Sequence, residues 1–425
     1  MLRKHLLLLF ILLLTSCARA AAPTTTPAAT RTATPTIKPT ESSNSMARAS
    51  TSTPNTAPSD TSAYFKTQCL EALPTLPTDF ALHENLVLRR SIDEPDVISD
   101  LRDQRVIRTL SGYASPNSIS PNGKWLALDF YKDESDVSPS FLIIESVDGK
   151  KTIKIPWDNH WDIYSDFAWL DNEHIVLNIF LGEYKQTGTP GVTYEEMAST
   201  VVINPFTNEK QYLHLSNFPD WEWIDQKPEK FVFERSNVIY NPTLTRALYL
   251  REIDYKSSVV LWDMQAGKAI TSLDDFKHRS NPAWIPGEKK FIVIMHQPEN
   301  IFSLDQDGHL EPLTHFEKIY STTIRIGDLN LSPDGEAIAF WLDQDDPDTA
   351  SHIRSDLLVL QLKTHTLTKY CFSSKLSFGD SGGAIKWSHN SRFLMLGTYL
   401  IDLQQNWITQ LMKSDYSPIG FVAEP

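Results

Sequence analysis

Short apolar segments alternate with polar turns along most of this chain. In the clearest case, residues 326–331 and 337–341 are apolar runs of strand length, and Ser332-Pro333-Asp334-Gly335 lies between them. Proline fixes the φ angle that the first central position of a tight turn requires, and glycine accepts the positive φ that most residues avoid. The pattern therefore predicts a β-hairpin.

Two kinds of hairpin recur along the chain. Turns of the first kind lie within residues 120–128, 169–177, 240–250, 284–287, 331–340 and 387–394. The second kind is clearest at residues 259–268 and recurs at 103–104, 148–149, 207–208, 307–308, 364–365 and 404–405. The turns are spaced by roughly 40 to 60 residues, which is the period of a four-stranded propeller blade.

The two kinds of hairpin differ in number, and this difference predicts how the ring closes. The first blade, which starts near residues 86–88, lacks an innermost strand, and residues 419–422 can supply it. Closure by a terminal strand leaves no open sheet edge at the axis. We therefore predict one all-β domain over residues 84–425, a β-propeller of seven four-stranded blades closed by the C-terminal strand, with six blades as the alternative.

The first 17 residues have the layout of a secretory signal peptide. Arg3 and Lys4 precede an apolar run over residues 6–14, which is too short to cross a bilayer as a helix. The ending Leu14-Thr15-Ser16-Cys17 resembles the lipobox of bacterial lipoproteins. The resemblance implies that lipid on Cys17 holds the mature protein at the outer side of a bacterial membrane, so we expect an extracytoplasmic location. An ordinary signal peptide with a chance cysteine is the alternative.

Residues 18–62 consist almost entirely of Ala, Thr, Pro and Ser. Such a segment buries too little apolar surface to offset its ordering entropy, so we expect a disordered tether. A connecting segment over residues 63–83 leads from it into the propeller. We expect a disulfide between Cys69 and Cys371, the two cysteines that remain in an exported chain; two separate buried thiols are the alternative.

The turn sequence Ser-Pro-Asp/Asn-Gly followed by an apolar strand resembles the propeller repeat of TolB-like periplasmic proteins. Trp262-Asp263 before Ala266-Gly267-Lys268 also resembles the WD-repeat. The resemblance covers most of residues 84–422 and implies a propeller that serves as a binding platform. It carries over no catalytic residue, because the matched positions are turn and core residues.

Charge and motifs exclude several classes of function. The formal net charge is −14 and no basic stripe is present, so we expect no nucleic-acid partner. The sequence has no metal or cofactor motif of the C-x-x-C, H-E-x-x-H or P-loop type, and we expect neither group. Gly379-Asp380-Ser381-Gly382-Gly383 resembles the nucleophile segment of serine proteases, but no histidine lies in the matching setting, so we assign no catalytic residue.

The connections predicted for one face of the ring are long and rich in aromatic and acidic residues. We place a partner-binding face there, on Trp157, His160, Trp161, Phe218 and Trp221. Aromatic rings with interleaved carboxylates are typical of surfaces that bind sugars or proteins. The sequence thus predicts a non-catalytic binding or scaffold module for a protein or glycan, and an extracellular propeller enzyme acting on glycans or peptides is the alternative.

Overall fold

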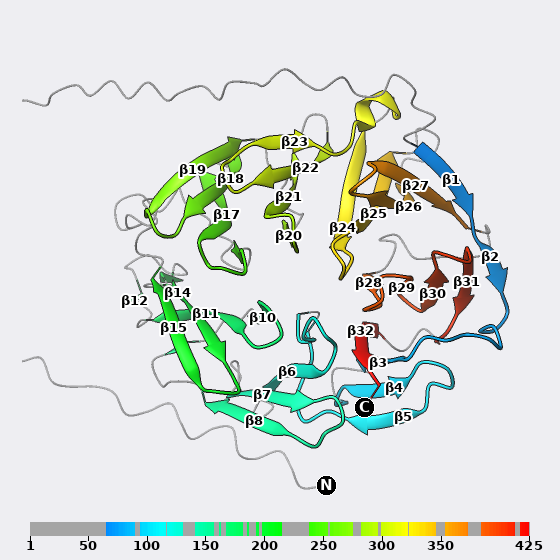
Figure 1. Cartoon of the computed structure of the whole chain (residues 1–425), viewed down its shortest axis with the longest axis horizontal. Helices are drawn as coiled ribbons and strands as arrows, with labels where there is room; N and C mark the ends of the chain where they lie inside the picture. The colour runs from blue at the N-terminus through cyan, green and yellow to red at the C-terminus, as the bar shows by residue number, and fades with distance from the viewer. Residues whose placement is uncertain are drawn as a thin grey trace, which may run out of the picture. The chain divides into compact units, whose positions relative to one another are not determined.

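The structure is a computed structural model, and it divides the chain into two units, Met1–Ala57 and Pro58–Pro425. It describes residues 65–89, 94–115, 117–130, 141–156, 161–162, 167–181, 185–186, 193–194, 198–214, 238–253, 256–274, 282–295, 299–321, 323–345, 353–372, 384–412 and 417–424. All of these lie in the second unit. They form the predicted all-β propeller of seven blades (Figure 1), and the described helical structure is one 3-10 turn, η5 (Phe316–Lys318).

Each blade is an antiparallel sheet that runs outwards from the axis. From the innermost strand to the outermost, blade 1 contains β32 (Ser417–Ala423), β3 (Glu84–Arg89), β4 (Val97–Asp100) and β5 (Val106–Thr109). Blade 2 contains β6 (Trp125–Phe130), β7 (Phe141–Ser146) and β8 (Thr152–Pro156), and single bridges from Tyr113 and Ile119 form its inner edge. Blade 3 contains β10 (Phe167–Trp169), β11 (Ile175–Leu181), β14 (Ala198–Asn204) and β15 (Glu209–His214). In the same blade β9 (Trp161–Asp162) pairs with β11, while β12 (Lys185–Gln186) and β13 (Thr193–Tyr194) form a separate hairpin.

The other four blades follow the same order. Blade 4 contains β16 (Ile239–Tyr240), β17 (Arg246–Ile253), β18 (Lys256–Asp263) and β19 (Lys268–Asp274). Blade 5 contains β20 (Ala283–Ile285), β21 (Lys290–Met295), β22 (Asn300–Asp305) and β23 (Leu310–Pro312). Blade 6 contains β24 (Ile324–Leu331), β25 (Ala337–Asp345), β26 (Ile353–Gln361) and β27 (Thr366–Cys371). Blade 7 contains β28 (Ile385–Trp387), β29 (Phe393–Leu396), β30 (Tyr399–Asp402) and β31 (Trp407–Gln410).

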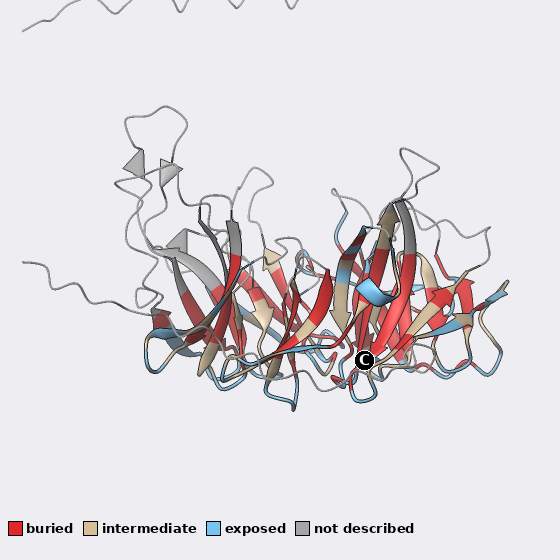
Figure 2. Cartoon of the chain, turned by 90° about the horizontal axis from the view of Figure 1, so that it is seen from above, coloured by how far each residue is buried: buried red, intermediate tan, exposed pale blue. Residues whose placement is uncertain are grey.

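The core consists of seven apolar clusters, one between each pair of neighbouring blades. Successive residues of a strand point to opposite faces of its sheet, so each blade contributes to two clusters. In β17, for example, Ala247 and Tyr249 pack against blade 3, and Leu248 packs against blade 5. Seven interfaces that include one between blades 7 and 1 settle the blade number at seven. Buried positions accordingly run through the middle of the sheets (Figure 2).

The C-terminal strand closes the ring, as the sequence predicts. β32 pairs antiparallel with β3 and becomes the innermost strand of blade 1. Ile419 and Val422 pack between blades 1 and 2, and Phe421 packs between blades 7 and 1. The two ends of the repeat array are thus joined both by backbone pairing and by buried side chains.

Residues 65–83, which we call the N-terminal strap, run along the outside of two blades before the chain enters blade 1 (Figure 1). β1 (Phe65–Cys69) pairs in parallel with β27 as a fifth strand of blade 6, and β2 (Glu71–Leu73) pairs in parallel with β31 of blade 7. The predicted disulfide between Cys69 and Cys371 is present. Further along the strap, the ring of Phe80 makes edge contacts with Phe393 and Trp407 of blade 7. The strap therefore spans the interface at which the ring closes.

The turns of blades 2, 6 and 7 that begin with serine share one hydrogen-bond pattern. In blade 6 the Ser332 hydroxyl donates to Asp334 Oδ1 over 2.6 Å and accepts from Ala337 N over 2.9 Å. The same two bonds recur from Ser120 in blade 2 and from Ser388 in blade 7. The serine and the acid or amide two residues later thus satisfy the polar groups of each turn.

No helix in the described part of the chain is long and apolar enough to span a membrane.

Candidate functional site

The predicted partner-binding face lies almost wholly outside the described residues. This holds for Trp157, His160, Phe218 and Trp221, and Cys17 is outside them as well. The structure describes the main chain of Trp161, which pairs with Leu181 at one end of β11. The face therefore remains a prediction.

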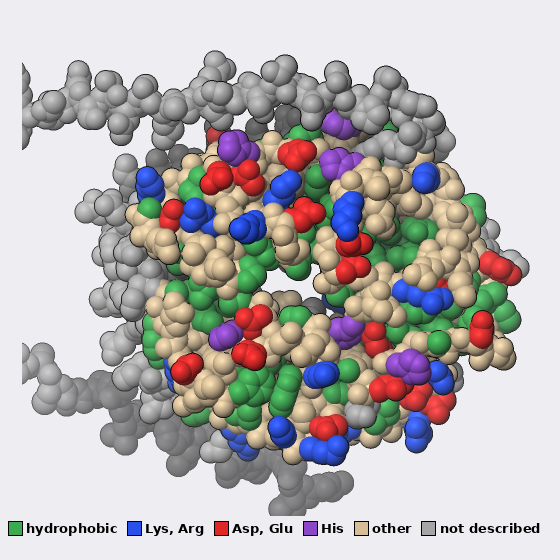
Figure 3. Space-filling model, in the orientation of Figure 1, with side chains coloured by type: hydrophobic (Ala, Val, Ile, Leu, Met, Phe, Trp, Pro, Cys, Tyr) green, Lys and Arg blue, Asp and Glu red, His purple; other side chains and the backbone are tan. Residues whose placement is uncertain are grey.

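An axial cavity of about 790 Å³ lies where the innermost strands of the propeller converge. Blades 1, 2, 5, 6 and 7 contribute to its wall, and Figure 3 shows the ring hollowed at its centre. Its lining includes the turn residues Pro121, Pro286 and Pro333, together with Asp328 and Lys386. This volume lies within the range of about 300 to 1,000 Å³ that small-molecule sites occupy.

Two of the strands that line the cavity carry bulges. In β24, Asp328 and Leu329 together oppose one residue of β25, because the register shifts between Gly327 and Asn330. In β32, Ile419 is the extra residue between the positions paired with Val87 and Leu88. Among the described pairings of an innermost strand with its neighbour, these two alone contain a shift. Bulges re-aim side chains and are common next to binding and active sites.

Asp328 has a strained main chain and projects from the bulge of β24. Its φ is 47°, and it is the one described non-glycine residue with a positive φ inside a strand; the others lie in turns. Its carboxylate accepts a hydrogen bond of 2.6 Å from Ile385 N of blade 7 and one of 3.1 Å from Asn330 Nδ2. Strain of this kind persists where surrounding contacts hold it and is frequent at binding sites.

Lys386 lies on β28, next to this bulge. Burial lowers the pKa of its ammonium group, and the negative charge of Asp328 opposes that shift in part. Lys386 makes no ion pair or side-chain hydrogen bond with the described part of the chain. An amine that is half-buried at a cavity wall without a protein partner can interact with an anion from outside.

The other prominent side chains at the wall have structural partners. Trp387 donates from Nε1 to Asn330 O of the preceding blade over 3.0 Å. Trp169, which does not line the cavity, makes the equivalent bond to Ser118 O of its preceding blade over 2.8 Å. Each of these tryptophans joins two neighbouring blades. His389 Nδ1 lies 3.0 Å from Glu84 Oε2, and its imidazole lies against Gly123 so closely that a Cβ there would clash with it. The histidine thus links three blades.

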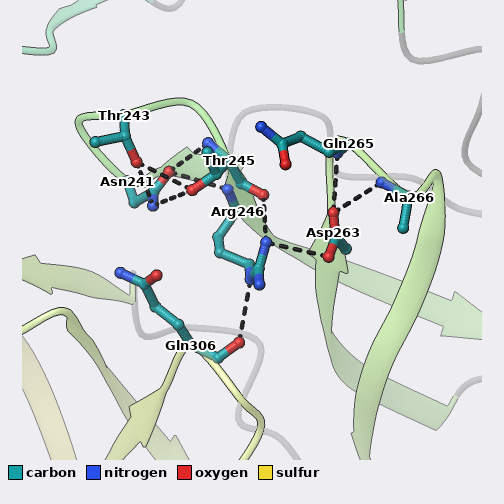
Figure 4. Close-up of polar contacts among 8 residues, drawn as sticks. All are labelled: Asn241, Thr243, Thr245, Arg246, Asp263, Gln265, Ala266 and Gln306. Atoms are coloured by element: carbon teal, nitrogen blue, oxygen red, sulfur yellow. Dashed lines mark hydrogen bonds and ion pairs between the residues drawn. The ribbon is translucent and has the colours of Figure 1, made fainter.

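The Arg246 cluster shows what a purely structural polar network looks like in this fold (Figure 4). Arg246 Nη1 lies 3.2 Å from Asp263 Oδ2, and its Nε donates to Gln306 O of blade 5 over 3.1 Å. Asp263 Oδ1 also accepts from the main-chain N–H groups of Gln265 and Ala266. Donors and acceptors are matched within this cluster, in contrast to the lysine in the axial cavity.

The described residues contain no group of three or more His, Cys, Asp or Glu side chains arranged to hold a metal ion. The axial wall offers instead one cation, one anion, amides and an indole ring, all in one cavity. Such a set binds by ion pairing and hydrogen bonding.

Sequence reasoning did not single out Asp328 and Lys386. Asp328 lies inside an apolar run that we read as a regular strand, and Lys386 lies within a second such run. The polar residues that interrupt these runs were the available signal. Their meeting at one cavity depends on how blades 6 and 7 pack, which local patterns do not encode.

No family model matches the sequence, and no curated protein matches it. Solved structures with a similar fold include TolB from Acinetobacter baumannii, with 11% identity, a TM-score of 0.38 and coverage of 78% of this chain and 81% of that chain. Oligogalacturonate lyase from Vibrio parahaemolyticus has 10% identity, a TM-score of 0.47 and coverage of 78% and 87%. A protein of unknown function from Desulfotomaculum acetoxidans has 11% identity, a TM-score of 0.45 and coverage of 80% and 99%. These similarities concern the TolB-like propeller fold and say nothing about ligand or activity.

Proposed function

We propose that this protein is a non-catalytic binding protein on the outer side of a bacterial membrane, held there by lipid on Cys17. Its ligand is a glycan or the glycan portion of a protein, and the axial cavity takes it up. The single observation that carries this proposal is the cavity itself. It has the volume of a ligand site, bulged strands in its wall, and a lysine without a partner among the described residues.

The residues at the wall support binding rather than turnover. A general base needs a free nitrogen or oxygen that can reach the substrate. The one histidine at the wall is held between Glu84 and Gly123, and Asp328 already accepts two hydrogen bonds. These groups are suited to holding a ligand in place.

A cavity-filling variant tests the proposal. Ala384 is exposed at the wall, so Ala384→Phe should occupy the cavity without disturbing the core. Ala72→Phe is the matched control, because Ala72 is exposed on β2 at the outer edge of blade 7. We expect glycan-array binding by the wild type and by Ala72→Phe, loss of binding in Ala384→Phe, and recovery of the glycan unchanged. Equal binding by all three proteins would contradict the site, and recovery of a cleaved glycan would favour the enzyme alternative.

A further inference from the structure

Lys386 and Asp328 line the same cavity but do not form an ion pair with each other. Asp328 is held by Ile385 N and by the Asn330 amide, and these contacts fix the carboxylate in place. Lys386 has no such contact within the described residues. A pair that served only the fold would be expected to close on itself, because an isolated half-buried charge is costly. The open arrangement leaves one site for an anion and one for hydrogen-bond donors.

We propose that the axial cavity binds a sugar acid, whose carboxylate pairs with Lys386 and whose hydroxyl groups donate to Asp328. This inference rests on the proposed function and specifies the class of glycan. The ligand must supply an anion, because a neutral sugar would leave Lys386 unpaired. Its hydroxyl groups can donate to the lone pairs of Asp328 that Ile385 N and Asn330 Nδ2 leave unused. A uronic acid residue carries both kinds of group on one ring.

The surroundings of the two charges fit such a ligand. Asn117 and Asn330 add amide groups to the wall, and Trp387 adds an indole ring that its hydrogen bond to Asn330 O holds in place. Rings and amides placed around a charged pair are typical of pockets that orient a small polar molecule. Burial removes water from the Lys386 ammonium group, and this is the main cause of its lowered pKa. A bound carboxylate would compensate for that lost hydration.

The test compares a uronic acid disaccharide with its methyl ester, which keeps every hydroxyl group and loses only the charge. Titration calorimetry on the purified chain should show binding of the acid and at least about tenfold weaker binding of the ester, since a charged hydrogen bond is lost. Lys386→Gln should weaken binding of the acid about tenfold and leave the ester unchanged. Lys124→Gln is the matched control, because it makes the same charge change at an exposed position of a neighbouring turn.

Several outcomes would overturn the inference. Equal affinity of the wild type for the acid and the ester would show that the ligand's charge does not contribute to binding. Equal affinity of Lys386→Gln and Lys124→Gln for the acid would show that Lys386 does not contribute. A dipeptide has a carboxylate and an ammonium group but no sugar hydroxyls, so tighter binding of a dipeptide than of the uronate would assign the cavity to another class. If Ala384→Phe blocks binding of a neutral glycan while the uronate does not bind, the proposed function stands and this inference fails.

Discussion

Cys69 and Cys371 lie opposite each other on the parallel strands β1 and β27, with their Cα atoms 4.4 Å apart and a disulfide between them. They are 302 positions apart in the sequence. The bond therefore joins the strap to the outer strand of blade 6, and the covalent loop that it closes contains β3–β5 of blade 1 and the whole of blades 2 to 6.

Loss of this disulfide should lower the free energy of unfolding. Closing a loop of this length restricts the unfolded chain, and chain entropy limits the stabilisation to about 5 kcal/mol. Under oxidising conditions we expect Cys69→Ser to unfold at a lower urea concentration than the wild type. After full reduction of the wild type, the two proteins should unfold at the same urea concentration. Free-thiol titration of the unfolded, unreduced wild type checks the bond directly, and titration of both Cys69 and Cys371 would refute it.

Removal of residues 417–425 should cause aggregation. The deletion takes away β32, which covers the inner edge of β3 and buries Phe421 and Val422. An uncovered strand edge beside an open apolar interface is a site for intermolecular pairing. Size-exclusion chromatography at low concentration checks this, with deletion of residues 424–425 as the control. A monomeric truncated protein with unchanged melting would contradict this account of ring closure.

Stability should fall in acid, in part because of Asp263. Hydrogen bonds from the main chain of Ala266 lower the pKa of its carboxyl most, and Gln265 and the charge of Arg246 act in the same direction, while burial opposes them. A carboxyl with a lowered pKa in the folded state stabilises the fold above its ordinary value of 3.8. That contribution is lost as the pH drops through the folded-state pKa.

Asp263→Asn should therefore be less stable than the wild type at pH 7 and lose less stability between pH 7 and pH 3. Urea midpoints at the two pH values measure both effects. Asp274→Asn, at an exposed position of β19, controls for the loss of one negative charge. An identical pH dependence in the wild type and Asp263→Asn would show that this carboxyl contributes nothing.

Cys17→Ala should release the protein from membranes or block its processing. The acyl chains expected on Cys17 bind a bilayer more tightly than a single chain can, because each buried methylene adds to the affinity. Fractionation of cells that express the full chain tests this, with Ser16→Ala as a neighbouring control. A wild-type protein that is soluble and begins at a residue other than 17 would contradict lipidation.

The face predicted around Trp157 and Trp161 calls for its own test. Trp161→Ala combined with Trp221→Ala should abolish ligand binding if that face is the site, and it should leave binding at the axial cavity intact if it is not. The same glycan array with both the double variant and Ala384→Phe separates the two sites. A double variant that fails to fold, seen as loss of cooperative melting, would place these rings in the core.

The parts of the fold that the sequence predicts are those with local signals. Ser332-Pro333-Asp334-Gly335 and its counterparts mark turns because proline and glycine restrict the main chain at those positions. The sequence predicts closure by residues 419–422 because it contains one fewer hairpin of the first kind than of the second. By contrast, nothing local distinguishes β1 and β2 as outer strands, because parallel addition to a blade edge depends on which edge is free.

The axial site could not be predicted from the sequence, for a related reason. A bulge at Asp328 moves the side chains of a strand, but the residues around it read as an ordinary apolar run. The environment of Lys386 is set by strands from blades 1, 6 and 7, which meet only after the ring has closed.

The strap also determines how mechanical load would enter the protein. If lipid on Cys17 anchors the chain, as we propose, a pull on that anchor reaches the propeller at Phe65 and acts along β1, which pairs with β27 over its full length. Its parallel hydrogen bonds are then loaded together in shear, and Cys69 passes the remaining tension through a covalent bond into blade 6. This covalent route bypasses the strap beyond Cys69, including Phe80 against Trp407. The seam between β3 and β32 and the axial cavity would therefore keep their geometry while the anchor is under tension.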